Sequence, residues 1–381
     1  MALSIQEVHY LRTHFAQVQE ALQALGPHNK KDQMRQAVQL RQQFGDAGRA
    51  VMELASARAS SSLPQTWLMD KDSAQQATHP LVAARRAKRI ASTMPGATVA
   101  DVTCSIGAEL AALSHEGLRA IGSDIDPARL AMAQHNVAGT PLLQADALAP
   151  AVRADVMIAD PARRSGGRRI WKPEDLQPPL PTLLDTWHHT PCAIKCAPGL
   201  NYSFWEGGVS VVSVDGGVKE LCLYSPELLQ GREAVLINSA GGIDTLHSDM
   251  PDAVAVTEPR RYIIDPDGAI VRAGLVRHYA HRESLSMLDP HIAYLTGNSI
   301  PEGTSGFAYI ESVGLKQLKT TLQGYDCGSL EILVRGVDVD PDRLRKQLKL
   351  RGSQPMAIII ARIGDGAQAM ICHPRQHHAV A

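Results

Sequence analysis

The chain has 381 residues, more than one hydrophobic core usually supports, so we expect two or three folding units. Its 44% hydrophobic and 20% charged residues are typical of a globular protein and exclude a disordered or collagen-like chain. The 38 basic and 39 acidic residues give a net charge of -1, which excludes a polycation and makes any affinity for nucleic acid a local property.

The sequence predicts a soluble protein of the reducing cytoplasm. No apolar run reaches the length of a membrane span, and Glu7 and Arg12 stand where a secretory signal would need apolar residues. The six cysteines contain no C-x-x-C pair and are too few for a disulfide framework in so long a chain. We therefore expect neither a membrane partner nor a metal site.

Residues 1–77 predict a helical N-terminal domain. Apolar residues recur at spacings of three and four over residues 4–25, the pattern of one amphipathic helix, which Gly26 and Pro27 end. A second helical stretch follows over residues 33–57, and a serine-rich segment closes the domain.

Residues 78–240 predict an α/β domain with a doubly wound, Rossmann-like sheet, because short apolar segments alternate with helical runs. The expected strands cover residues 98–102, 118–124, 141–144, 156–160, 193–196, 221–224 and 234–237. A Gly- and Asp-rich linker is expected over residues 239–252. Residues 253–381 then predict a compact α+β domain, with a helix near 269–280, strands near Tyr309 and Ile332, a basic helix over 341–350 and a final hairpin over 356–371.

Acidic residues end four successive predicted strands, at Asp101, Asp124, Asp146 and Asp160. In open parallel sheets, ligands bind outside the carboxyl ends of the strands, so these residues describe one crevice. Residues 99–110 read as strand, tight turn and helix start, which places backbone N–H groups at a ligand. A carboxylate at the end of the second strand can accept both hydroxyls of a ribose.

This combination resembles the class I S-adenosylmethionine-dependent methyltransferases over about residues 78–237. The resemblance implies S-adenosyl-L-methionine as cofactor, with Asp101 beneath its methionine amino group, Asp124 on its ribose, Asp146 near its adenine amino group and Asp160-Pro161 facing the transferred methyl. The other residues that we expect to contact the cofactor are Thr78, Thr103, Cys104, Ser105, Gly107, Ile125 and Ala147. Where that class reads Asp-x-Gly-x-Gly-x-Gly, this chain has Thr103, Ser105 and only Gly107.

Longer runs carry a closer resemblance. The segments QATHPLVAARRAKRI, DPARR, KCAPGL, DGGVKELCLYS and LEILVRGVDVDPDRLRKQLKLRG are similar to a bacterial methyltransferase family with a C-terminal THUMP-like domain. The tail match covers about residues 262–371, and the central part is similar to the trimethylguanosine synthases of RNA caps. THUMP domains bind RNA, so the resemblance implies an RNA substrate, and we expect no DNA partner.

The acceptor of the methyl group depends on the loop after the fourth strand. Base amino-group methyltransferases carry Asn/Asp-Pro-Pro-aromatic there, whereas this chain reads Asp160-Pro161-Ala162-Arg163, with Trp171 further along as a candidate stacking residue. Basic residues in this loop and in the helix over 341–350 are expected to bind RNA phosphates, namely Arg163, Arg164, Arg168, Arg169, Lys172, Arg345 and Lys346. A base nitrogen is one predicted acceptor.

A ribose 2′-hydroxyl is the other predicted acceptor. Ribose methyltransferases arrange Lys-Asp-Lys-Glu around the reacting hydroxyl, and this chain has Asp160, Lys195 and Glu220 at strand ends, with Lys88 in the helix ahead of the first strand. Clustered lysines would stabilise a developing alkoxide. We therefore count Asp160, Pro161, Lys195 and Glu220 as candidate catalytic residues.

The residues disfavour some other functions and leave others open. A dehydrogenase could use Asp124 for a nicotinamide dinucleotide, but G-x-G-x-x-G is absent and Glu109 would repel a pyrophosphate. Cys196 lacks the Thr-Cys context of a 5-methylcytosine nucleophile. A noncatalytic RNA-binding protein with this fold and a small-molecule methyltransferase remain alternatives to an RNA methyltransferase, and the oligomeric state is not predicted.

Overall fold

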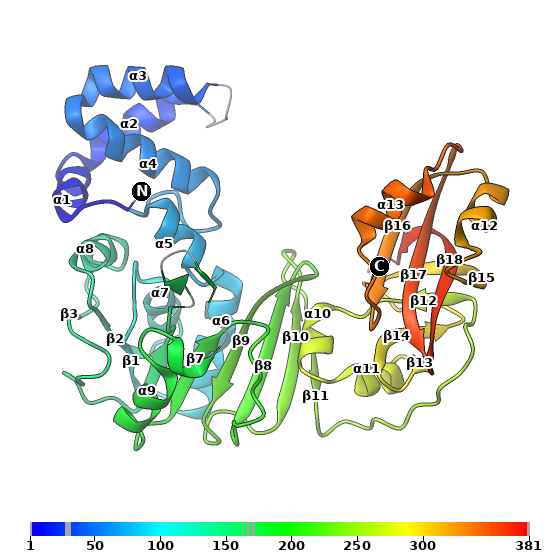
Figure 1. Ribbon diagram of the computed structural model, residues 1–381. Coiled ribbons are helices and arrows are strands. Elements are labelled where there is room, and N and C mark those ends of the chain that lie inside the picture. Colours follow the sequence, from blue (N-terminus) through cyan, green and yellow to red (C-terminus); the bar gives the residue numbers. More distant parts are fainter. Residues whose placement is uncertain (1, 27–31, 163, 166–167, 170–171, 379–381) are drawn as a thin grey trace. The chain divides into compact units, whose positions relative to one another are not determined.

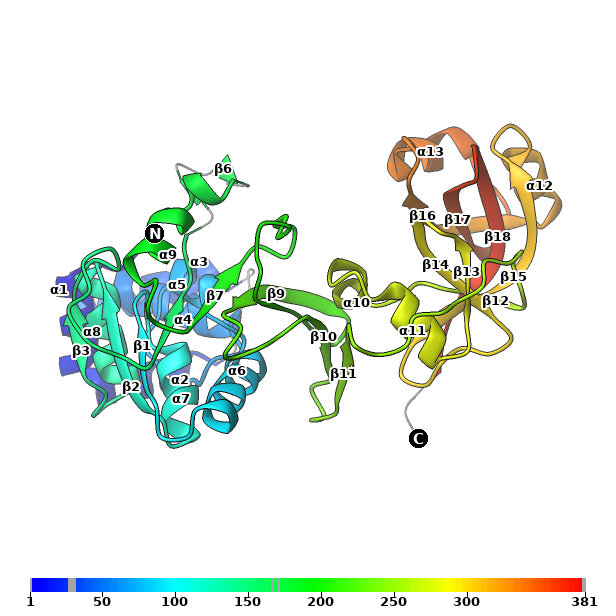
Figure 2. The same cartoon turned by 90° about the horizontal axis from the view of Figure 1, so that it is seen from below.

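The computed structural model describes residues 2–26, 32–162, 164–165, 168–169 and 172–378 (Figures 1 and 2). The chain forms two compact units: Met1–Val214 with Lys219–Gln230, and Asp215–Val218 with Gly231–Ala381. In the described ranges, no helix combines the length and the apolar character that a bilayer span requires.

The first unit begins with the α-helices α1 (Ile5–Thr13), α2 (Phe15–Leu25), α3 (Gln33–Phe44), α4 (Gly48–Ala59), α5 (Lys71–Gln76) and α6 (Pro80–Thr93). Figure 1 shows α1, α2, α3 and α4 gathered at one end of this unit. Val8, Leu11 and Val18 are buried, which confirms the apolar stripe. The stripe lies on two helices instead of one, because His14, with φ −104° and ψ 23°, interrupts the helical backbone and stacks its ring on Tyr10.

The sheet of the first unit has the strand order β8-β9-β7-β4-β1-β2-β3. Its strands are β1 (Thr98–Asp101), β2 (Arg119–Asp124), β3 (Leu142–Gln144), β4 (Val156–Ala159), β7 (Cys192–Cys196), β8 (Gly208–Val214) and β9 (Gly217–Tyr224). Strands β1, β2, β3, β4 and β7 are parallel, and β9 runs antiparallel to β7. The predicted doubly wound sheet is confirmed, although β8 is missing from the predicted strands and the strand predicted over residues 234–237 is β10 (Arg232–Ile237), which belongs to the second unit.

Helices connect the parallel strands, as the predicted alternation requires. They are α7 (Ala108–His115) after β1, α8 (Pro127–Asn136) after β2 and α9 (Leu180–Thr186) before β7. Because every parallel crossover returns to the same edge, the carboxyl ends of β1, β2, β3 and β4 lie together. All four residues of β4 are buried, as expected for a central strand covered on both faces.

The second unit holds a hairpin, a seven-stranded sheet and short helices. Its strands are β10 (Arg232–Ile237), β11 (Ile243–His247), β12 (Tyr262–Ile264), β13 (Ser286–Asp289), β14 (Ile292–Gly297), β15 (Ser305–Gly314), β16 (Cys327–Arg335), β17 (Gln354–Ile363) and β18 (Gly366–His377). Its helices are α10 (Gly268–Arg272), α11 (Val276–Arg282), α12 (Leu318–Gly324) and α13 (Pro341–Leu348). The sheet order is β13-β14-β12-β15-β18-β17-β16.

Two sequence predictions for this unit need correction. The expected linker over residues 239–252 contains β11, which pairs antiparallel with β10 across a turn closed by the N–H of Asn238 on the carbonyl of Gly242. The helix expected over residues 269–280 is divided into α10 and α11, because Gly274 adopts φ +68°, a left-handed conformation that ends a helix. The predicted basic helix and final hairpin are present as α13 and β17–β18.

Candidate cofactor and acceptor site

A cavity of about 980 Å³ opens in the first unit at the carboxyl ends of the parallel strands. The turn after β1, the ends of β2 and β4, and the segment around α5 line it. The predicted residues that line it are Thr78, Asp101, Thr103, Cys104, Ser105, Asp124, Ile125, Asp146, Ala147, Asp160, Pro161, Lys195 and Glu220. Gly107 is not among the lining residues; it precedes α7 with φ +93°, where an added Cβ would approach Val137 to 3.0 Å.

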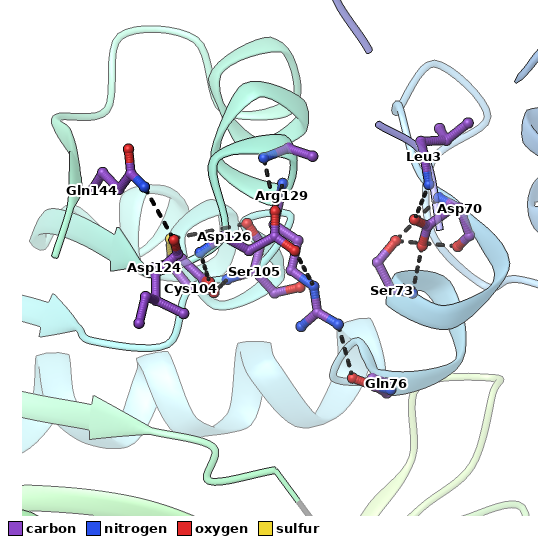
Figure 3. A network of polar contacts seen from close by, with 12 residues as sticks. Leu3, Asp70, Ser73, Gln76, Cys104, Ser105, Asp124, Asp126, Arg129 and Gln144 are labelled. Carbon is purple, nitrogen blue, oxygen red and sulfur yellow. Dashed lines mark hydrogen bonds and ion pairs between the residues drawn. The ribbon is translucent and has the colours of Figure 1, made fainter. Parts of the chain in front are cut away.

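The turn between β1 and α7 is held against the end of β2. Ser105 adopts φ +47°, and its backbone N–H donates to Asp124 Oδ2 over 2.9 Å. The backbone N–H of Asp126 donates to the other oxygen, Oδ1, also over 2.9 Å, as Figure 3 shows. Two backbone donors therefore orient the Asp124 carboxylate while leaving its remaining lone pairs for ligand hydroxyls.

The surroundings of Asp124 fit the nucleoside part of the implied cofactor. The Ile125 side chain is 68% exposed at the cavity wall and offers an apolar surface that a flat ring can cover. Gln144 Nε2 donates to the Ile125 carbonyl over 3.2 Å and supports that residue from β3. Ser105 Oγ is buried with no hydrogen-bond partner among the described residues, so a polar ligand can satisfy it.

Asp101 lines the part of the cavity in which the methionine part of the implied cofactor is expected. Burial, with a further contribution from the charge of Glu109, raises the pKa of Asp101 to about 8. One oxygen, Oδ1, accepts the backbone N–H of Thr103 over 3.2 Å. A cationic amino group beside Asp101 would favour the ionised carboxylate, which is the chemistry that a methionine ammonium requires.

Beyond the cofactor region, buried charges of alternating sign reach from the cavity into α6. Lys195 Nζ lies 2.8 Å from Asp160 Oδ2 and 3.8 Å from Glu109 Oε1. Arg86 Nε lies 3.1 Å from Glu109 Oε2, and Arg86 Nη2 lies 2.6 Å from Glu220 Oε1. Each charge is therefore compensated by a partner at short range, the condition under which buried ions are tolerated.

Burial disfavours the charged forms of these groups, but their partners outweigh it. Arg86 and Lys195 lower the pKa of Glu109, and Asp160 together with Glu109 raises the pKa of Lys195. Lys195 is accordingly a fixed cation at neutral pH and has no free lone pair with which to act as a base.

Arg86 belongs to a basic run with Arg85, Lys88 and Arg89, a composition typical of an exposed helix face, but only 1% of its side chain is exposed. A signal was available: Arg86 lies four residues from both Val82 and Ile90, which are buried on the same face of α6. Lys88 is exposed on that helix and does not line the cavity. Glu220 lines the cavity but pairs with Arg86, so the structure does not assemble the Lys-Asp-Lys-Glu arrangement with Lys88.

The predicted RNA-binding residues lie in both units. Arg163 and Trp171 lie outside the described residues, and Arg164, Arg168 and Arg169 are described by their backbone alone, in the paired strands β5 (Arg164–Ser165) and β6 (Arg168–Arg169). Lys172 is exposed. In the second unit, Arg345 and Lys346 are exposed on α13, and Arg345 pairs with Asp342 over 2.7 Å.

This chain is similar to known proteins in sequence and in fold. Residues 307–374 match the THUMP domain-like family. A protein of Mycobacterium tuberculosis, present in two strains and named an uncharacterized S-adenosylmethionine-dependent methyltransferase, is 43% identical over 363 residues, which cover 88% of this chain and 99% of the relative. A crystal structure from Porphyromonas gingivalis W83, described as a candidate methyltransferase, has a TM-score of 0.64 and 17% identity, covers 91% of this chain and 98% of its own, and shows the same fold.

Proposed function

The chain belongs to the S-adenosylmethionine-dependent methyltransferases, and from this premise we propose that it methylates RNA, with a base nitrogen as the acceptor. S-adenosylmethionine, when bound, supplies an electrophilic methyl group on a sulfonium. The observation that carries the RNA proposal is the THUMP domain-like match over residues 307–374, in the same chain as the cavity. That match supports RNA as the substrate, whereas the cavity alone does not distinguish RNA from a small molecule.

Three carboxylates would hold the cofactor. Asp124, oriented by two backbone N–H groups, would accept the ribose hydroxyls, and Asp101 would face the methionine ammonium. Asp146 lines the cavity beside Ala147 and accepts the backbone N–H of Leu148 over 2.9 Å, which supports a place near the adenine amino group. Ile125 would cover one face of the adenine.

The acceptor would stand against Asp160 and Pro161. The Asp160 side chain is 24% exposed, and its carboxylate can accept a hydrogen bond from an amino N–H, direct the nitrogen lone pair and take up the proton that the methylated nitrogen releases. The ribose alternative requires Lys195 to assist at a hydroxyl. A cationic Lys195 can stabilise an alkoxide, but the second lysine of that arrangement, Lys88, does not line the cavity, and Glu220 pairs with Arg86. The geometry therefore favours the nitrogen acceptor.

RNA contacts would come from the predicted basic residues of the loop after β4 and of α13. We also propose that residues 1–77, 78–240 and 253–381 act as helical, catalytic and RNA-directed parts. The cytoplasm is the proposed location.

The test uses total RNA from cells that lack the protein, incubated with purified protein and S-adenosylmethionine carrying a deuterated methyl group. Mass spectrometry of the nucleosides should detect one base that gains a labelled methyl on nitrogen, and Asp160→Ala should abolish the product while cofactor affinity changes little. Label on the ribose would contradict the nitrogen acceptor. Absence of label from every nucleoside, with the cofactor bound, would favour a small-molecule substrate instead.

A further inference from the structure

The turn after β1 reaches across to the end of β4 through a side chain. The backbone N–H of Asp160 donates to Thr103 Oγ1 over 2.7 Å, although the two residues are 57 positions apart. Paired residues of β1 and β4 end at Asp101 and Ile158, and the N–H of Val102 still donates to the Ile158 carbonyl over 2.9 Å. The Thr103 hydroxyl therefore extends the connection between these strands into the loop that carries Asp160.

This bond depends on the residue type at position 103. Thr103 stands at the first of the turn positions where the resemblance leads one to expect glycine, and neither glycine nor alanine has a side-chain oxygen in the place of the Thr103 hydroxyl that accepts the Asp160 N–H. A threonine is also restricted at χ1 by its branched Cβ, so its oxygen is held in few directions. The Thr103 N–H in turn donates to Asp101 Oδ1, which fixes the backbone that carries the hydroxyl.

Asp160 is thus held at both its backbone and its side chain. Thr103, in the turn between β1 and α7, accepts the Asp160 N–H through its hydroxyl. Lys195, on β7, places its Nζ 2.8 Å from the Asp160 carboxylate. We propose that Thr103 is a positioning residue that fixes the position of Asp160 relative to the turn between β1 and α7. The inference rests on the proposed function for the role of Asp160 toward the acceptor, but the hydrogen bond can be examined without a substrate.

The substitution Thr103→Val removes the acceptor oxygen while keeping the branched shape, and Thr103→Ser is the matched control that keeps the oxygen. Hydrogen exchange of the Asp160 amide, read by mass spectrometry with residue-level fragmentation, should become about tenfold faster or more in Thr103→Val and stay near wild type in Thr103→Ser. Circular dichroism and thermal melting of both variants verify that they fold.

Transfer to RNA provides the second measurement. The single-turnover rate with RNA from cells lacking the protein should fall roughly ten- to a hundredfold in Thr103→Val, recover in Thr103→Ser, and change little when Thr103→Val is added to Asp160→Asn. The calorimetric Kd for S-adenosylmethionine should change by a clearly smaller factor than the rate does, because Thr103 lines the cavity but the proposed effect acts through Asp160.

Two results would overturn the proposal. Asp160 exchange as slow in Thr103→Val as in wild type would mean that the hydrogen bond does not hold the loop. A loss of cofactor affinity as large as the loss of rate would mean that Thr103 acts on the cofactor alone. If wild type labels no RNA, the proposed acceptor is wrong, and the exchange and calorimetry measurements still decide the role of Thr103.

Discussion

Arg86 is the residue on which the buried charges converge, since its guanidinium meets both Glu109 and Glu220 and only 1% of its side chain is exposed. Replacing Arg86 with Met should lower the free energy of unfolding by about 3–5 kcal/mol, because buried Glu220 loses its ion-pair partner and buried Glu109 keeps only Lys195. Denaturant titration measures this change. Lys88→Met, on the exposed side of the same helix, should change stability by no more than about 0.5 kcal/mol. Equal losses in the two variants would show that α6 as a whole, and not the charge of Arg86, matters.

Asp101 should make cofactor binding depend on pH. Its pKa of about 8 means that the free protein carries it protonated at pH 7, whereas a neighbouring cationic amino group favours the carboxylate. Binding should therefore release a proton, and affinity should rise from about pH 6 to about pH 7.5, below the range where the ligand's own amino group titrates. Calorimetry in two buffers of different ionisation enthalpy measures the release. Asp101→Asn should abolish it, and undiminished proton release in that variant would assign the titration to another group.

At the scale of elements, the turn between β1 and α7 contains Ser105, which has a strained backbone and which we propose as a cofactor-binding residue. Ser105 at φ +47° occupies a conformation that favours glycine, and its Oγ is buried without a partner among the described residues. Ser105→Gly should raise the free energy of unfolding by about 1 kcal/mol and weaken S-adenosylmethionine binding. Chemical unfolding and calorimetry measure the two effects.

The matched substitution in the same turn is Gly107→Ala. It should destabilise the protein, because φ is +93° and the new Cβ would approach Val137. Cofactor affinity that is unchanged in Ser105→Gly would remove Ser105 Oγ from the proposed binding residues.

On the scale of the whole molecule, a net charge of -1 provides no general attraction for RNA, so the RNA binding that we propose must come from local clusters. The logarithm of RNA affinity should fall with the logarithm of salt concentration by about 0.7 per phosphate contact for single strands. Arg168→Ala with Arg169→Ala, and separately Arg345→Ala with Lys346→Ala, should each flatten this slope without changing cofactor affinity. Fluorescence anisotropy with labelled RNA measures the slopes. Arg277→Ala, an exposed arginine outside both clusters, is the control, and slopes equal to wild type in both double variants would make the clusters ordinary surface.

Much of the candidate cofactor site could be predicted from the sequence, because the alternation of strands and helices brings the carboxyl ends of parallel strands to one edge. Asp101, Asp124, Asp146 and Asp160 could therefore be assigned to one cavity, which they do line. The sequence did not predict strand β8 or the helix breaks at His14 and Gly274, since these features depend on local backbone conformations that the apolar periodicity does not specify.

The partner of each charge and hydroxyl became visible only in three dimensions. Arg86 meets Glu109 across 23 positions and Glu220 across 134, and Thr103 meets Asp160 across 57. Periodicity reports which face of an element is apolar, but it carries no information about which side chains from different elements come within hydrogen-bond distance. That choice follows from the packing of α6, α7, β7 and β9 around the cavity, and it turns an apparent surface arginine into the centre of a buried network.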